Sequence, residues 1–187
     1  MIPMDKPEAE SIASFFRHVL KLKSLKRTGW VRKGVSDPES VADHCYGVAL
    51  LSMVIARREG LDEGKALKMA LLHDLPESVS GDLTPHDKEY KRKRAIEEKS
   101  MGAIVSSLPE GLRSEIVALH KEFEDCRTPE AKAVETADKL DMVLTASEYE
   151  KAGADLGEFF GLGWADKLTE EGRRMLETFI KHRGTLR

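Results

Sequence analysis

Residues 70–78 read ALLHDLPES, an apolar helical segment that ends in an adjacent histidine and aspartate, His73 and Asp74. Asp62 is placed to cap the start of this helix, and Pro76 ends or kinks it because a proline ring removes a helical hydrogen bond. Side chains of neighbouring helical residues project about 100° apart. His73 and Asp74 can therefore reach one point only at a helix end, which Pro76 and the loop after it are expected to provide.

The segments before this helix are also predicted to be helical. Apolar residues recur at helical spacing from Ile12 onward and predict a first helix up to about Arg27, followed by a loop over residues 28–39. Ser40 is then a suitable N-cap, and Asp43 three residues later completes an acidic capping box. The helix that they begin is expected to continue until Gly60 stops it.

The segments after it follow the same helical pattern. Residues 78–87 are rich in Ser, Gly, Asp and Pro and predict a loop, and a highly charged helix is expected over residues 88–107. Pro109 opens a further helix. Thr128–Pro129 is a good N-cap and N1 pair for a helix that extends to about Lys151.

The chain as a whole is predicted to be all-α. No alternating β pattern of useful length occurs, and a Gly-rich connection leads to a final amphipathic helix at about 166–182. We expect six or seven helices in one domain over residues 1–187, with a motif-bearing core at about 26–150 and the C-terminal helix packed on it.

Composition fits one globular domain. Of 187 residues, 34% are charged and 41% are hydrophobic, which suffices for a sizeable core. The net charge of −3 gives no reason to expect nucleic acid as a partner, and no apolar run approaches the roughly 20 residues of a membrane span. Cys45 and Cys126 lie far apart without a CxxC motif, so we expect no disulfide framework and a cytoplasmic location.

Three otherwise apolar helical segments each contain side chains that commonly bind metals. These side chains are His44, the pair His73–Asp74, and Asp138. Each has an ordinary explanation when taken alone: a lone helical histidine is usually a satisfied polar residue, and Lys139 is available to pair with Asp138. Burying several such groups unpaired would cost a few kcal/mol each, about 2 or more. A shared cation removes that cost, and two imidazoles with two carboxylates suit Mn, Co, Mg, Ni, Fe or Zn.

These residues occur in an ordered set of motifs: RTGW (27–30), PESVADH (38–44), ALLHDLPES (70–78), GDLTP (81–85) and ADKLDMVLTASEYE (137–150). The set resembles the HD-domain superfamily of metal-dependent phosphohydrolases, and in particular the 5′-deoxynucleotidases, which remove phosphate from deoxyribonucleoside 5′-monophosphates. The resemblance implies an HD-domain helical bundle with one divalent cation, whose ligands map onto His44, His73, Asp74 and Asp138. Asp141 competes for the last position, and Asp138 is preferred because it opens the DKLD segment as the family's ligand does.

Two further acids follow the HD pair. By the resemblance, Glu77 and Asp82 belong to the active site, with Glu77 handling a proton and Asp82 binding the sugar or assisting the leaving group. The alternative is that they cap helices or lie in solvated loops.

A basic loop precedes the first expected ligand. The resemblance implies that an arginine and a tryptophan of this loop lie close to the phosphate and sugar, and Arg27, Trp30 and Arg32 are the candidates. Two residues separate Arg27 from Trp30, whereas some relatives join the two directly, so either Arg27 or Arg32 is the phosphate ligand. Trp30 is equally well explained as a core residue.

Other functions remain open at this stage. An HD phosphodiesterase or nucleoside triphosphate hydrolase is the enzymatic alternative, although only His86 and His120 lie between Asp74 and Asp138 to supply a second metal. A metal-stabilised helical regulatory module is the non-enzymatic alternative. The basic run at residues 91–94 is interpreted as a solvated helix face, because glutamates four residues on can pair with it. By resemblance, a homodimer acting on a small nucleotide is expected.

Overall fold

The computed structural model describes residues 5–161 and 163–183, and this part of the chain is all-α, as predicted. The α-helices (α) and 3-10 helices (η), in chain order, are α1 (Lys6–Leu22), α2 (Thr28–Arg32), α3 (Val41–Glu59), α4 (Glu63–Leu72), α5 (Glu77–Ser80), η1 (Tyr90–Arg92), α6 (Lys93–Ile104), α7 (Glu110–Asp125), α8 (Pro129–Lys151), η2 (Gly157–Phe160), η3 (Ala165–Lys167) and α9 (Glu170–His182). The expected six or seven helices are slightly too few, because the short helices α2 and α5 lie in segments that were predicted to be loops.

The predicted helix starts and stops are confirmed where a side chain or a glycine determines them. Ser40 and Asp43 form the capping box of α3, and Gly60 ends that helix in the left-handed conformation with φ 70°. The side chain of Asp62 accepts a hydrogen bond from the Lys65 N–H at the start of α4. The side chain of Thr128 caps α8 in the same way.

The first helix is shorter than predicted, because it ends at Leu22 and not near Arg27. Past that point the backbone forms hydrogen bonds with another segment. The Arg27 N–H donates to the Glu39 carbonyl at 3.1 Å, and the Val41 N–H donates to the Leu25 carbonyl at 2.8 Å. Apolar spacing alone could not reveal this pairing, which holds the loop before α3 against the end of α1.

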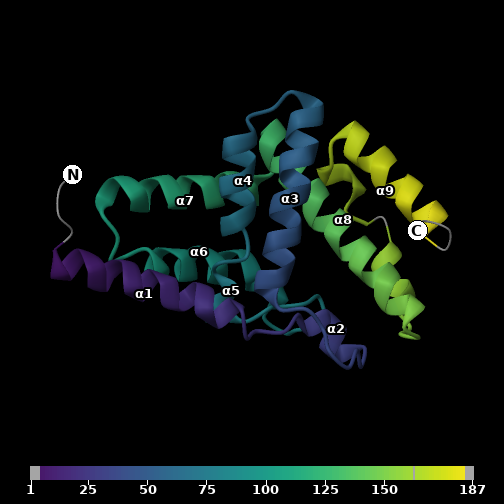
Figure 1. Ribbon diagram of the computed structural model, residues 1–187, viewed down its shortest axis with the longest axis horizontal. Helices are drawn as coiled ribbons and strands as arrows, with labels where there is room; N and C mark the ends of the chain where they lie inside the picture. The colour runs from purple at the N-terminus through teal and green to yellow at the C-terminus, as the bar shows by residue number, and fades with distance from the viewer. Residues whose placement is uncertain (1–4, 162, 184–187) are drawn as a thin grey trace.

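Helix α3 lies at the centre of the molecule (Figure 1). It packs most extensively on α4 and α8, and α9 packs in turn on α8. On the side of α3 away from α8 and α9 in Figure 1, α1, α6 and α7 form a second group, in which α6 contacts α7 and α5 joins α1 to α6. None of the described helices combines the length and the apolar character that a membrane span requires.

The core has two parts, and α3 contributes to both. Val41 and Cys45 pack with side chains of α6 and α7, whereas Val48 and Ile55 pack with side chains of α4 and α8. His44 lies between these two sets on the same helix, so the chain places an imidazole where the two parts of the core meet.

The contact between α8 and α9 depends on a glycine. A Cβ atom added to Gly172 would lie 2.5 Å from two side-chain atoms of Thr136, which is buried in α8. We expect Gly172→Ala to lower the free energy of unfolding by about 1–3 kcal/mol, because overpacking forces the two helices apart. Urea unfolding followed by circular dichroism measures this change.

Gly102 provides the matched control, because a Cβ at this position of α6 would meet no atom within 4 Å. Gly102→Ala should stabilise the protein by about 0.5–1 kcal/mol through helix propensity alone. A Gly172→Ala variant as stable as the Gly102→Ala variant would contradict the close approach of α9 to α8.

Candidate metal centre and active site

His44 is buried, and its tautomer is set by an aspartate. The capping box at the start of α3 places His44 one turn into the helix, facing α8. Its Nδ1 lies 2.7 Å from Asp141 Oδ2. An ionised carboxylate only accepts hydrogen bonds, so Nδ1 carries the proton and Nε2 keeps its lone pair. This Nε2 atom is buried and makes no hydrogen bond within the described residues.

His73 presents the same nitrogen. It follows the last residue of α4, and its Nδ1 lies 2.6 Å from the carbonyl oxygen of Ala70. A carbonyl also only accepts, so Nδ1–H is the donor here as well. His73 Nε2 is again buried without a hydrogen bond in the part of the chain that the structure describes.

Two carboxylates converge on these Nε2 atoms. Asp74 Oδ2 lies 3.2 Å from Nε2 of His73 and 3.6 Å from Nε2 of His44. Asp138 Oδ1, contributed by α8, lies 3.2 Å from the same Nε2 of His44. Because α4 ends at Leu72, as the proline predicted, the adjacent residues 73 and 74 both face one point.

The charges around this point favour a cation. Burial would raise the pKa of Asp74, but the neighbouring His73 outweighs burial and holds that pKa below its ordinary value. Burial likewise would lower the pKa of His73, yet the carboxylates of Asp74 and Asp138 raise it to about 9, so the excess negative charge here draws a positive charge, a proton or a metal cation, to Nε2 of His73. Lone pairs and carboxylate oxygens that face one another in a buried site need a positive charge between them. The donor set therefore fits a divalent cation of the borderline type.

Asp138 and Asp141 differ in which nitrogen of His44 they face. Asp138 lies on the Nε2 side, whereas Asp141 accepts the Nδ1 proton and so orients the ring. A second group of possible metal-ligand atoms, from Glu39, His44 and Asp141, also lies together, with all three atoms within 4.8 Å of one another. Its carboxylates already accept hydrogen bonds, Glu39 from the indole N–H of Trp30 at 2.9 Å and Asp141 from His44.

Gly47 makes room for this orientation. It lies one turn after His44 on α3, and a Cβ atom there would overlap the carboxylate of Asp141. The position of the Asp141 carboxylate that lets it reach His44 thus requires a glycine at position 47. Gly47 was not expected to belong to the site, and a glycine in the middle of a helix was the available signal.

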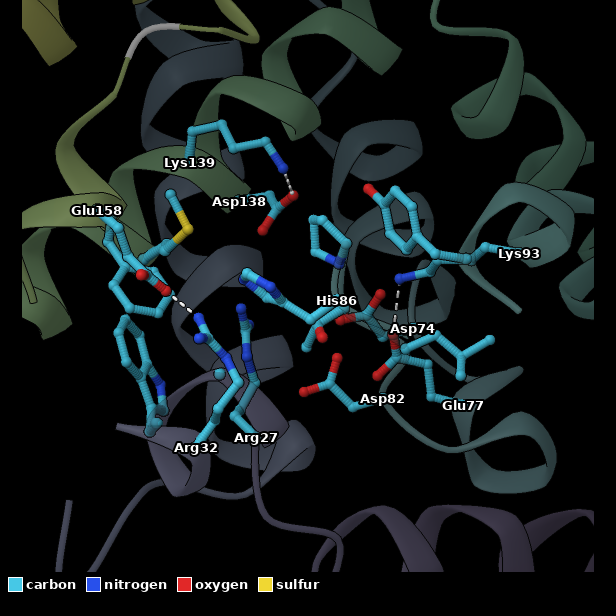
Figure 2. Close-up of a pocket in the computed structure, with 18 of the residues that line it drawn as sticks. Arg27, Arg32, Asp74, Glu77, Asp82, His86, Lys93, Asp138, Lys139 and Glu158 are labelled. Atoms are coloured by element: carbon cyan, nitrogen blue, oxygen red, sulfur yellow. Dashed lines mark hydrogen bonds and ion pairs between the residues drawn. The ribbon is translucent and has the colours of Figure 1, made fainter. Parts of the chain in front are cut away.

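The cluster opens onto a cavity of about 450 Å³. Five of the other residues singled out from the sequence line it, namely Arg27, Trp30, Arg32, Glu77 and Asp82. Figure 2 shows Asp74, Glu77 and Asp82 on one side of the cavity, with Arg27 and Arg32 extending into it from below. The structure thus brings residues from α2, α3, α5, α8 and the turn after α4 to one place.

Glu77 is buried and lies opposite a lysine. Its Oε1 is 3.0 Å from Nζ of Lys93, the first residue of α6, while its Oε2 is buried without a hydrogen bond among the described residues. Burial raises the pKa of Glu77 well above its ordinary value, and Lys93 only partly opposes this. Glu77 begins α5, so a short helix and an ion pair fix its position.

Asp82 joins two loops. Its Oδ2 accepts a hydrogen bond from the Thr28 N–H at 2.6 Å, which ties the loop after α5 to the start of α2. Asp82 is part-buried, and it caps the first N–H of α2 from another loop, so the capping alternative for this residue holds alongside its place in the cavity lining.

The two candidate arginines have different surroundings. Arg32 and Lys33 both pair with Glu158 of η2, so the charge of Arg32 is already matched. Arg27 has a buried Nη1 atom without a hydrogen bond in the described chain. Burial opposes its charge, but Asp74, Asp138 and Asp82 raise the pKa of Arg27 above its ordinary value, so it stays cationic.

Trp30 is a core residue at the wall of the cavity. It is 1% exposed, and its ring lies 4.4 Å from that of Phe159 and 5.6 Å from that of Tyr149, measured between centroids. Its indole N–H is already donated to Glu39.

Several residues of the cavity were not expected from the sequence. Lys93 belongs to the basic run that was interpreted as a solvated face, and this interpretation is wrong for Lys93, because its Nζ pairs with buried Glu77. The expected pair of Lys93 with Glu97 is nevertheless confirmed, at 3.4 Å. The expected pair of Arg94 with Glu98 is replaced by a pair with Asp125. A lysine four residues before a buried glutamate was the only available signal.

Lys139 and His86 also line the cavity. Lys139 Nζ lies 2.7 Å from Asp138 Oδ2, so the ordinary partner considered for Asp138 is present, and the other oxygen of that carboxylate still faces His44. His86 extends from the loop after α5 into the cavity (Figure 2). His120 is buried in α7, outside the residues that line it.

Comparisons with known proteins agree with this arrangement. The family model described as HD domain matches residues 19–163. The chain is 46% identical over 145 residues to a 5′-deoxynucleotidase of Dictyostelium discoideum, covering 73% of this chain and 76% of that protein. It is 43% identical to a 5′-deoxynucleotidase of Homo sapiens, covering 76% and 70%.

Solved structures share the fold. A conserved hypothetical protein from Pyrococcus furiosus is 35% identical, with a TM-score of 0.78 over 93% of this chain and 99% of that one. A predicted metal-dependent phosphohydrolase from Magnetospirillum magnetotacticum has a TM-score of 0.75 over 96% of each chain, and at 22% identity it supports the fold alone. The resemblance inferred from the motifs is thus confirmed, and the chain belongs to the HD domain family.

Proposed function

We propose that this protein is a metal-dependent phosphohydrolase that removes phosphate from deoxynucleoside 5′-monophosphates. The observation that carries the proposal is the pair of buried, unpartnered Nε2 atoms of His44 and His73 beside two carboxylates, at the floor of a cavity large enough for a small ligand. Relatives 43–46% identical are named 5′-deoxynucleotidases, which supports the same substrate class.

We assign one divalent cation to His44, His73, Asp74 and Asp138. When bound, such a cation lowers the pKa of its water and polarises a phosphoryl oxygen. Both donor groups found among the described residues include His44, which favours a single metal over a two-metal phosphodiesterase centre.

The chain's own residues have separate parts in this proposal. Arg27 binds the phosphate, because its buried Nη1 lacks a partner and Arg32 is already paired. Glu77 handles the proton of the departing 5′-oxygen through Oε2, and its raised pKa suits a group that must hold and release a proton. Asp82 holds the loop after α5 in place through Thr28 and offers its other oxygen to the sugar. Trp30 contributes a wall of the cavity.

The alternatives are phosphodiester or nucleoside triphosphate hydrolysis and a non-enzymatic regulatory role. A purely structural metal site would need neither a cavity nor the additional buried acid Glu77. The homodimer and the cytoplasmic location expected from the sequence stay predictions.

The substrate class is tested by phosphate release from 5′-dNMPs, 5′-NMPs, 3′-nucleotides, cyclic nucleotides and dNTPs, with Mn, Co and Mg supplied separately. We expect hydrolysis of 5′-dNMPs, and a Glu77→Gln variant that keeps its metal and fold but loses turnover by about 100-fold or more. That variant also controls for a contaminating phosphatase. Activity confined to cyclic nucleotides or triphosphates would replace the proposed substrate, and no release under any condition would favour the regulatory alternative.

The metal assignment is tested through Gly47, which binds no metal itself. Gly47→Ala displaces the Asp141 carboxylate and removes the hydrogen bond that orients His44. Loss of such an orienting partner should lower metal affinity by about 10- to 100-fold. Isothermal titration with Mn or Co measures this, with Gly102→Ala as the control. Unchanged affinity would show that Asp141 does not orient a metal ligand.

The part assigned to Glu77 is tested through its partner Lys93. Lys93→Met leaves the Glu77 carboxylate free to rotate, so we expect kcat to fall by about 10- to 100-fold while KM and metal content change little, because positioning a proton-transfer group is worth about that much. Lys93→Arg should restore part of the loss. Lys91→Met, in the same basic run but outside the cavity lining, is the control. Equal losses in the Lys91 and Lys93 variants would refute a specific part for this ion pair.

A further inference from the structure

The cavity above the metal centre has two ends of different chemistry. Asp74, Glu77 and Lys93 lie at one end, and Glu158 lies at the opposite end in Figure 2. Three apolar side chains also line the cavity and form its apolar wall, namely Met142, Phe159 and Trp164; Phe159 follows Glu158 in η2, and all three pack against the same part of the core. The catalytic proposal uses none of these three side chains.

Each of the three is placed by a different element. Met142 is one turn after Asp138 on α8, so the apolar wall begins about 5.4 Å along the helix from a proposed metal ligand. Phe159 of η2 rests on the ring of Trp30 and on Gly29, where a Cβ atom would lie 3.2 Å from its ring. Phe159 therefore packs closely against α2, with its ring tilted by 41° to that of Trp30.

Trp164 differs from Phe159 because it packs against the core without any contact to another aromatic ring of the described chain. It is half-buried at the edge of the cavity, and its indole forms no hydrogen bond and no ring contact with the described residues. An indole without a partner that faces a cavity exposes a large apolar surface, which a planar ligand would cover.

We propose that Met142, Phe159 and Trp164 form the nucleobase subsite, in which the base of the substrate stacks on Trp164. The inference rests on the proposed function, because it needs a nucleotide whose phosphate lies at Asp74 and Asp138. The sugar then spans the turn of α8 between Asp138 and Met142, which directs the base toward the aromatic wall. The charges nearest to this wall are already neutralised, since Glu158 pairs with both Arg32 and Lys33.

Recognition of this kind does not depend on base identity. Stacking uses the π-face that every base has, and the three wall side chains offer no acceptor or paired donors to read a base edge. The subsite therefore supplies binding energy that is common to purine and pyrimidine substrates. Because the base does not react, this energy acts equally in the ground state and the transition state, so it affects KM and leaves kcat unchanged.

The test compares substrates with and without a base. In the metal-loaded enzyme, Trp164→Ala should raise KM for dAMP and dCMP by about 5- to 150-fold, the effect of losing one base stack, with kcat unchanged. KM for 2-deoxyribose 5-phosphate, which has no base, should not change. Trp164→Phe should retain most of the affinity for dAMP, since it keeps an aromatic face.

Tyr46→Ala removes an exposed aromatic side chain of α3 outside the cavity lining and serves as the control. An unchanged KM for dAMP in Trp164→Ala, or an equal rise with 2-deoxyribose 5-phosphate, would overturn the subsite while the proposed function stands. Failure of the unaltered protein to hydrolyse any 5′-dNMP would instead overturn the proposed function, and the subsite with it.

Discussion

The arrangement of the site depends on two imidazole rings whose Nδ1 protons are already committed. His44 donates its Nδ1–H to Asp141 and His73 donates its own to the Ala70 carbonyl, so both Nε2 atoms face the same buried place. The two carboxylates at the same place cannot satisfy these Nε2 atoms, because ionised carboxylates also only accept hydrogen bonds. A cation is the simplest charge that satisfies all four groups, and the helices that carry them are held together from outside the cluster.

That outside support comes from the junction of two cores. Helix α3 packs Val41 and Cys45 into one cluster and Val48 and Ile55 into the other, with His44 between them. Movement of α3 relative to the helices around it would therefore disturb the packing of both clusters. The close approach at Gly47 then sets the distance between Asp141 and His44. A rigid scaffold of this kind keeps the donor atoms in place before any ligand arrives.

The sequence was sufficient for the features that local chemistry determines. The caps at Ser40, Asp62 and Thr128 were predicted, and so was the end of α4 that lets residues 73 and 74 face one point. Features that depend on distant segments were missed. The end of α1 is set by hydrogen bonds to residues 39–41, and Lys93 acquires its partner Glu77 only because α6 folds back over α5. The choice between Arg27 and Arg32 likewise needed the position of Glu158.

The charges of the cavity are arranged so that an anion can enter a site rich in carboxylates. Lys139 forms an ion pair with one oxygen of Asp138, and Lys93 forms one with one oxygen of Glu77. The second oxygen of each of these acids is not paired with a lysine. Arg27 alone among the cavity arginines keeps a buried nitrogen without a partner, within the described residues. A phosphate would thus meet a fixed guanidinium and a cation, not bare carboxylates. Because the apolar wall carries no free charge, the polar end determines what chemistry occurs, and the wall determines only how strongly the rest of the substrate is held.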